Sequence, residues 1–399
     1  METFEAPKID LTLDMKRAMQ LAYAENRDQS PAFLIPFENN NDPLGMNKFE
    51  VVAGAPSYIS IADRHQVTTI LRLIAETFHN LRGMIPCIAV VGKHGNPCGA
   101  AFDWHYPKAA ILKALKGDAV AVMGGELVVN FPIDDALGKL IYKVPDDHNI
   151  GRPYWGLDIA LAPSFSPATV DLLGQKEKRR LLVNDALLYP GLSPDDWLIQ
   201  PVSGGILTQR AANFILHPNM IEHWTGEMSN EDFETLIIAW AVCWKASSNT
   251  VALAKDGMLI GLGCGQQDRI FCTRLAIDKA NYASHNTQDS IFASDAHFPY
   301  AKSTLKNSKE MMEKLEYSVD DAPEPPDNPR EFLKILDILR AKIAKLDKRE
   351  GHELLIDAGC KGGVVPGDGN NLEEVKKVFA DAGLAVGFLN KIHRGFAKH

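Results

Sequence analysis

Apolar side chains recur at helical spacing in the first third of the chain, and a short apolar run follows them. Positions 67, 70, 71, 74 and 78 are apolar, which predicts a helix over residues 63–81 with Asp63 as its N-cap. Residues 85–91 form a continuous apolar run that predicts a buried strand. The expected continuation is a polar, glycine-rich turn over 92–99, a helix over 106–116 and a second strand over 119–123.

A similar succession of elements is predicted later in the chain. It consists of a helix over 231–245, a strand over 250–254, a hairpin-like turn over 255–257 and a strand over 259–263. This alternation of helices and strands favours an α/β fold. Two similar halves, 1–210 and 211–399, are one interpretation of the repeated order, with the boundary near residues 205–215.

The segment from 302 to 350 has a different composition. It is dense in Lys and Glu, and an acidic, proline-rich break occupies 320–327. An amphipathic helical pattern follows the break. This pattern predicts a flexible linker and a helical hairpin on the surface. We expect it to serve packing or a dimer contact rather than catalysis.

Composition narrows the class of protein. The 399 residues are 46% hydrophobic and 23% charged, which is typical of globular proteins. A net charge of −9 argues against a general nucleic-acid binder. No apolar run approaches the ~18–20 residues of a membrane span, and the N-terminal residues lack a signal-peptide pattern. We therefore expect a cytoplasmic protein that partners neither nucleic acid nor membrane.

The cysteines support the same interpretation. Six occur, and no two of them form a C-x-x-C pair. A disulfide framework is not expected in a long chain with so few cysteines. Buried, reduced thiols are predicted instead.

Residues 90–100 contain the first group with chemical potential. A predicted strand ends in a compact turn that carries Lys93, His94 and Asn96. Histidine can move a proton near neutral pH, and a neighbouring lysine can stabilise a developing oxyanion. A solvated polar loop is the alternative interpretation of these residues.

The same segment invites comparison with zinc deaminases, whose signature is H-x-E followed by P-C-x-x-C. Position 96 is Asn rather than Glu, and Cys98 has no second cysteine three positions later. A zinc site at this turn would lack ligands. The sequence therefore predicts no metal.

Two later segments also carry polar groups. Residues 261–269 superficially resemble a dinucleotide-binding loop, but the third glycine falls at the wrong offset. A phosphate or substrate loop with Arg269 as an anion anchor fits this segment better. Residues 293–300 combine an acidic turn with aromatics, and alone they are typical of a helix cap beside core aromatics.

Four of these segments together resemble the formyltransferase part of the bifunctional purine-biosynthesis enzyme that makes IMP. Residues 93–99 resemble the family's Lys-His-x-Asn-Pro-Cys-Gly, and Ser248-Asn249 resembles its Ser-Asn pair. Residues 261–282 are close to its eukaryotic-type loop and helix. Residues 294–300 resemble its Ser-Asp-Ala-Phe-Phe-Pro-Phe. The four matches occur in the family's order and span most of the chain.

This resemblance implies transfer of a formyl group from 10-formyltetrahydrofolate to the 5-amino group of AICAR, 5-aminoimidazole-4-carboxamide ribonucleotide. It implies that His94 is the base, that Lys93 stabilises the oxyanion or aids the leaving nitrogen, and that Asn249 holds the formyl group. The implied AICAR-binding residues are Tyr23, Gly124, Asp158, Arg269 and Arg394. The implied folate-pocket residues are Ile270, His297, Phe298, Pro366 and Gly369.

The resemblance also implies an architecture. The family's fold is a tandem repeat of cytidine-deaminase-like, three-layer α/β/α subdomains without zinc, to which this chain adds the helical arm at about 302–350. In the family, active sites form across a homodimer interface. The first family motif begins near Leu21, which leaves no room before it for the family's cyclohydrolase domain. A separate IMP cyclohydrolase is therefore expected to perform the next step.

Departures from the family pattern leave alternatives open. The family's arginine before Tyr23 is Ala22 here, with Arg27 as a candidate replacement, and the first Phe of the folate-side motif is His297. These changes question the substrate more than the reaction class. A formyltransferase with another amino acceptor or donor is one alternative. A non-catalytic nucleotide-binding relative is the other.

Overall fold

The structure is a computed structural model of the 399-residue chain. It describes residues 12–148, 150, 156–175, 179–194, 197–212, 214–296, 298, 349–369, 371–390 and 395–396. The arm expected at about 302–350 therefore lies almost entirely outside the described residues.

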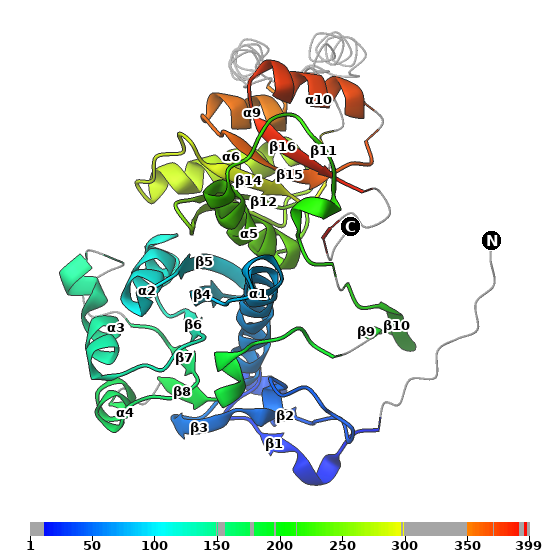
Figure 1. The fold of residues 1–399 in the computed structure, drawn as a ribbon. Coiled ribbons are helices and arrows are strands. Elements are labelled where there is room, and N and C mark those ends of the chain that lie inside the picture. The colour runs from blue at the N-terminus through cyan, green and yellow to red at the C-terminus, as the bar shows by residue number, and fades with distance from the viewer. Residues whose placement is uncertain are drawn as a thin grey trace, which may run out of the picture.

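A 12-stranded mixed sheet runs through the described part of the molecule (Figure 1). Its strand order is β11-β16-β15-β14-β12-β13-β5-β4-β6-β7-β8-β3. In chain order the strands are β3 Glu50–Ala53, β4 Cys87–Lys93, β5 Asn96–Asp103, β6 Glu126–Val129, β7 Ile159–Ala162, β8 Arg180–Val183, β11 Ile221–Trp224, β12 Val251–Lys255, β13 Met258–Gly263, β14 Ile291–Ser294, β15 Gly362–Pro366 and β16 Ala385–Leu389. Two small antiparallel sheets pair β1 Met19–Gln20 with β2 Phe33–Leu34 and β9 Trp197–Val202 with β10 Gly205–Arg210.

Helices cover both faces of this sheet. The described α-helices are α1 Tyr58–Arg82, α2 Pro107–Lys116, α3 Asp135–His148, α4 Pro167–Gly174, α5 Asn230–Lys245, α6 Arg269–Tyr282, α9 Gly351–Asp357 and α10 Leu372–Asp381. Short 3-10 helices lie at η1 Met15–Arg17, η2 Arg27–Gln29, η3 Met46–Lys48, η4 Asp185–Leu188 and η5 Pro218–Met220. No helix of the described part is long and apolar enough to cross a bilayer.

The order of elements repeats along the chain. The first series is β3-α1-β4-β5-α2-β6-α3-β7-α4-β8, and the second is β11-α5-β12-β13-α6-β14-α9-β15-α10-β16. In each series a hairpin is followed by three parallel strands, and the first strand closes the outer edge antiparallel to the last. The hairpin strands β5 and β13 pair antiparallel and join the two series into one sheet.

Three large apolar clusters and a smaller one around Leu21 form the core of the described residues. Helices α1 and α5 pack together on one face, where Phe78 and Trp240 are fully buried. On the opposite face, α2 and α3 pack over the first series of strands, and α6, α9 and α10 pack over the second. The molecule is thus an α/β structure with a sheet between two helical layers.

The structure confirms most of the elements expected from the apolar pattern. The helices predicted over 106–116 and 231–245 are α2 and α5, and the predicted turn 255–257 joins β12 to β13. The N-cap of α1 is Ser57 rather than Asp63, because the Ser57 hydroxyl accepts a bond from the Ser60 amide one turn earlier.

Two expectations are wrong. The turn predicted over 92–99 is a tight hairpin in which Lys93 pairs with Asn96, so residues 96–99 belong to β5. Residues 119–123 form turns rather than a strand, because Asp118 accepts a bond from the Ala121 amide and starts a turn there. The strand instead begins after Gly124-Gly125.

Candidate functional site

Candidate residues of both halves lie along the edge of the central sheet that is formed by one end of its strands, not along an outer strand. Strand β4 ends there at Lys93, while β6 and β7 begin there, directly after Gly124-Gly125 and Asp158. In the second series β12 begins at the same edge just after Asn249, because β13 runs antiparallel to its neighbours β5 and β12. The topology therefore gathers residues that are far apart in the sequence.

The turn at His94 is held by a carboxylate from another element. His94 and Gly95 both have positive φ, 54° and 73°, which makes a tight two-residue turn. Asp63 on α1 accepts the His94 amide at 2.9 Å and the Gly95 amide at 2.7 Å. The His94 side chain is exposed at this fixed turn. The backbone that carries the imidazole is therefore rigidly supported while the ring faces solvent.

A chain of contacts connects this turn to Asn249. Cys264, which follows β13, contacts the Asn96 Oδ1 through its Sγ at 3.7 Å. Two residues later, the Gln266 carbonyl accepts the Asn249 backbone amide at 3.0 Å and the Asn249 Nδ2 at 2.6 Å. The structure thus brings the Lys-His turn and the Ser-Asn pair to neighbouring loops.

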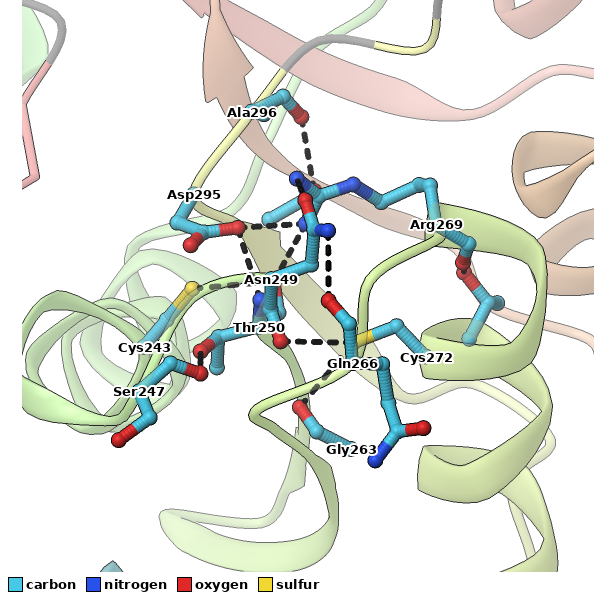
Figure 2. A network of polar contacts seen from close by, with 12 residues as sticks. Cys243, Ser247, Asn249, Thr250, Gly263, Gln266, Arg269, Cys272, Asp295 and Ala296 are labelled. Atoms are coloured by element: carbon cyan, nitrogen blue, oxygen red, sulfur yellow. Dashed lines mark hydrogen bonds and ion pairs between the residues drawn. The ribbon is translucent and has the colours of Figure 1, made fainter. Parts of the chain in front are cut away.

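Asn249 belongs to a buried polar network shown in Figure 2. Its Oδ1 accepts a bond from the Arg269 Nη2. The Arg269 Nη1 donates to the Thr250 carbonyl at 3.0 Å and forms an ion pair with Asp295. Asp295 also accepts the Thr250 amide at 2.9 Å. Arg269 is only 8% exposed, and its contacts fix the orientation of the Asn249 amide.

Gly124 and Asp158 face each other across two neighbouring loops. Gly124 donates its amide to the Gly156 carbonyl at 3.1 Å and has a φ of 70°. A Cβ at Gly124 would lie 3.7 Å from the Asp158 Oδ2. The Lys93 Nζ donates to the Met123 carbonyl at 2.7 Å. These contacts place the Lys93 ammonium beside two of the residues expected to bind AICAR.

Tyr23 lies next to an arginine that the sequence analysis does not single out. The Arg180 Nη2 donates to the Tyr23 hydroxyl at 2.9 Å, and its guanidinium carbon lies 5.6 Å from the centre of the Tyr23 ring. Tyr23 is 43% exposed. The arginine expected beside Tyr23 in sequence is Ala22, so Arg180 supplies a cation there from the start of β8.

Glu126, the first residue of β6, is a buried carboxyl at the same edge. Burial, together with the nearby Asp63 carboxylate, raises its pKa to about 9. Arg64 and Arg180 lie close enough to oppose this shift without cancelling it. The Glu126 Oε2 has no hydrogen-bond partner in the described structure. The carboxyl is therefore protonated near neutral pH.

The folate-side residues have varied environments. Ile270 is half-buried in the first turn of α6, and Pro366 is buried at the end of β15, three residues before Gly369. The Phe298 ring is 2% exposed and packs 6.0 Å from the Phe379 ring, so the expectation of a core aromatic is confirmed. His297 and Arg394 lie outside the described residues.

The cysteine side chains are free thiols. Four of them are buried, and burial raises the pKa of the Cys98 thiol to about 12. Within the described ranges no cluster of three or more His, Cys, Asp or Glu side chains is arranged to hold a metal ion.

Three residues at this end of the strands were not predicted from the sequence as part of the site. For two of them the sequence pattern gave a weak indication. Asp63 was assigned as a helix cap, although its polarity inside an apolar helical pattern also fits a contact with a neighbouring loop. Arg180 directly precedes the apolar run 181–183, which marks the start of a buried strand. Glu126 had no signal beyond following two glycines.

Comparison of sequences relates this chain to a known family. The chain matches the family described as the AICARFT/IMPCHase bienzyme over residues 2–279, and it belongs to that family.

Its relatives include the bifunctional purine biosynthesis proteins PurH. The protein from Thermoanaerobacter sp. (strain X514) is 29% identical over 298 residues. The protein from Bacillus cereus (strain B4264) is 30% identical over 297 residues. Each alignment covers 74% of this chain and 52% of the relative, so the chain spans about half the length of the curated relatives it matches.

Proposed function

We propose that this chain transfers a formyl group from 10-formyltetrahydrofolate to the 5-amino group of AICAR. Membership of the bienzyme family supports a role in purine biosynthesis. The observation that carries the choice of formyl transfer is the contact between Asn96 and Cys264, since it brings the Lys93-His94 turn beside the loop that holds Asn249.

The proposed reaction begins with attack of the AICAR amine nitrogen on the formyl carbon. The amine is conjugated with its ring and is a weak nucleophile, so removal of its proton by His94 assists the attack. Lys93 has two N–H groups left after its bond to Met123 and stabilises the oxyanion. The bond from the formyl carbon to the folate nitrogen then breaks, and that nitrogen takes a proton.

Asn249 positions the formyl group in this proposal. Its amide still has one N–H and one oxygen lone pair after its bonds to Gln266 and Arg269. The sequence analysis assigned Arg269 to the nucleotide phosphate. Its buried bonds to Asn249, Thr250 and Asp295 support a positioning role for Arg269 instead, and we propose that role.

The remaining assignments complete the proposed site. Tyr23, Gly124 and Asp158 bind the acceptor nucleotide together with Arg394. The folate pocket includes Ile270, His297, Phe298, Pro366 and Gly369. The proposed steps use 10-formyltetrahydrofolate as a co-substrate and call on no metal.

We also propose that the repeated order of elements reflects two cytidine-deaminase-like subdomains, 1–210 and 211–399, with the added arm at about 302–350. The active protein is proposed to be a cytoplasmic homodimer with sites at the interface.

The test is an assay of the purified chain with AICAR and 10-formyltetrahydrofolate. Tetrahydrofolate release is followed by absorbance, and the products are separated by chromatography. We expect formylated nucleotide to accumulate. His94→Ala is expected to lower kcat by about 10²- to 10⁴-fold, the usual contribution of a general base, while AICAR binding persists.

His105→Ala is a matched control, since His105 is also exposed and lies on the same half of the sheet away from the turn. It is expected to retain full activity. Absence of formyl transfer by the unmodified protein would contradict the proposed function. Unchanged turnover by His94→Ala would contradict the role of His94 alone.

A further inference from the structure

The acceptor nucleotide of the proposed reaction carries a phosphate, whose negative charge a cation in the site would neutralise. The family's arginine is missing at position 22, where the chain has Ala. Arg269 is committed to Asp295 and Asn249. Arg27, the candidate replacement from the sequence, is an exposed residue of η2. Among the described residues, Arg180 is the arginine seen to contact Tyr23.

Arg180 is held in place and still has donors to offer. Its Nε donates to the Ala55 carbonyl at 2.6 Å, and its Nη2 donates to the Tyr23 hydroxyl at 2.9 Å. Its Nη1 makes no hydrogen bond within the described residues and is solvent-accessible. Because the Tyr23 oxygen accepts from Arg180, the Tyr23 O–H proton can point outward. The two N–H groups of Nη1 and the Tyr23 O–H group therefore remain available to a ligand.

The charge of Arg180 has no counter-ion in the described structure. No described salt bridge includes it, although the residue is only 7% exposed. The neighbouring Glu126 carboxyl does not neutralise it at pH 7, since burial and Asp63 raise the pKa of Glu126 to about 9. A buried guanidinium without a counter-ion is unfavourable, and a bound anion would relieve that cost.

We propose that Arg180 and the Tyr23 hydroxyl together bind the phosphate of the acceptor nucleotide, an inference that rests on the proposed function. A guanidinium presents its N–H groups in a plane that matches phosphate oxygens, and charge-assisted bonds of this kind are strong. Arg180 thus takes the place of the arginine that the chain lacks before Tyr23.

The experiment compares two ligands that differ only in the phosphate. Binding of AICAR and of its phosphate-free riboside is measured by calorimetry for the unmodified protein and for Arg180→Gln. We expect Arg180→Gln to weaken AICAR binding about ten- to hundredfold, as for loss of a charged hydrogen bond, and to leave riboside binding unchanged. Arg27→Gln is the matched control and is expected to bind both ligands like the unmodified protein.

Tyr23→Phe keeps the experiment decisive if Arg180→Gln does not fold. Tyr23 is 43% exposed, so loss of its hydroxyl is tolerated by the fold, and the variant is expected to weaken AICAR binding but not riboside binding. Equal weakening of both ligands, a wild type without preference for the nucleotide, or a loss seen in Arg27→Gln overturns the proposal.

The experiments distinguish a failure of this phosphate-binding inference from a failure of the proposed formyl transfer. A protein that binds AICAR through Arg180 but transfers no formyl group keeps the phosphate site and loses the proposed reaction. A protein that transfers formyl while Arg180→Gln binds AICAR normally keeps the reaction and loses this inference.

Discussion

The position of His94 depends on Asp63, a residue that is distant in the sequence. The residue types at 93–96 predicted a reactive turn, and the tight hairpin agrees with that expectation. The support from Asp63 was not predictable, because it depends on how α1 packs over β4 rather than on any local pattern. In general, the chemical groups of this edge were recognisable from sequence, while the residues that hold them depend on tertiary packing.

The Glu126 carboxyl makes stability depend on pH. Its pKa is about 9 in the folded chain and about 4.5 when unfolded, so the folded state holds one more proton between these values. The free energy of unfolding therefore falls as pH rises from about 4.5 towards 9. We expect Glu126→Gln, which stays neutral, to raise stability at pH 8 and to flatten this fall. Urea unfolding at pH 5, 7 and 8.5 measures the effect.

The control for this prediction is Glu373→Gln, which removes an exposed carboxylate paired with Lys376. Its stability is expected to change by no more than about 0.5 kcal/mol at each of the three pH values. A Glu126→Gln variant with the same pH dependence as the unmodified protein would show that this carboxyl is ionised in the folded state.

At the scale of elements, apolar runs predicted most helices and strands, but they placed one strand at the wrong residues. Residues 119–123 are apolar yet mostly outside the core, since Asp118 starts a turn there. Strand β6 begins instead at Glu126, whose polar side chain precedes the apolar residues 127–129. Glu126 lies in the candidate site and departs from the apolar pattern of the strand. Apolar periodicity alone therefore misplaces β6.

Close contact between helix and sheet depends on glycine in the second hairpin strand of each series. A Cβ at Gly99 on β5 would lie 1.9 Å from the Ala114 carbonyl oxygen of α2, and one at Gly263 on β13 would lie 1.9 Å from the Cys272 carbonyl oxygen of α6. We expect Gly99→Ala to force these elements apart and to destabilise the protein by about 1–3 kcal/mol or more. Chemical denaturation followed by circular dichroism measures the loss.

Gly205→Ala is the matched control, because a Cβ at Gly205 on β10 would meet no atom within 4 Å. It is expected to shift the unfolding free energy by less than about 0.5 kcal/mol. Equal stability of the two variants would mean that α2 does not approach β5 as closely as described.

At the scale of the whole molecule, the two series of elements are joined through a common core. Strands β5 and β13 pair, and α1 packs against α5 within one apolar cluster. Glu234 on α5 accepts the Arg82 Nε of α1 at 2.9 Å and the Trp104 Nε1 that follows β5 at 3.0 Å. The sequence suggested two similar halves, but their union into one sheet required long-range contacts that no local pattern encodes.

This shared core predicts that the two series unfold together. Far-UV circular dichroism and tryptophan fluorescence are expected to report a single, coincident denaturation midpoint, the mark of a cooperative transition.

Glu234→Gln weakens the contact between α1 and α5. Because Arg82 is partly exposed, the expected loss in the free energy of unfolding is about 1 kcal/mol. Both probes should shift by the same amount, since the contact belongs to both series. Glu373→Gln, which removes a carboxylate whose side chain is 84% exposed, serves as the control and should shift neither. Two separated transitions, with Glu234→Gln moving only one of them, would show instead that each series is stable without the other, and the pairing of β5 with β13 would then be a docking contact rather than part of a common core.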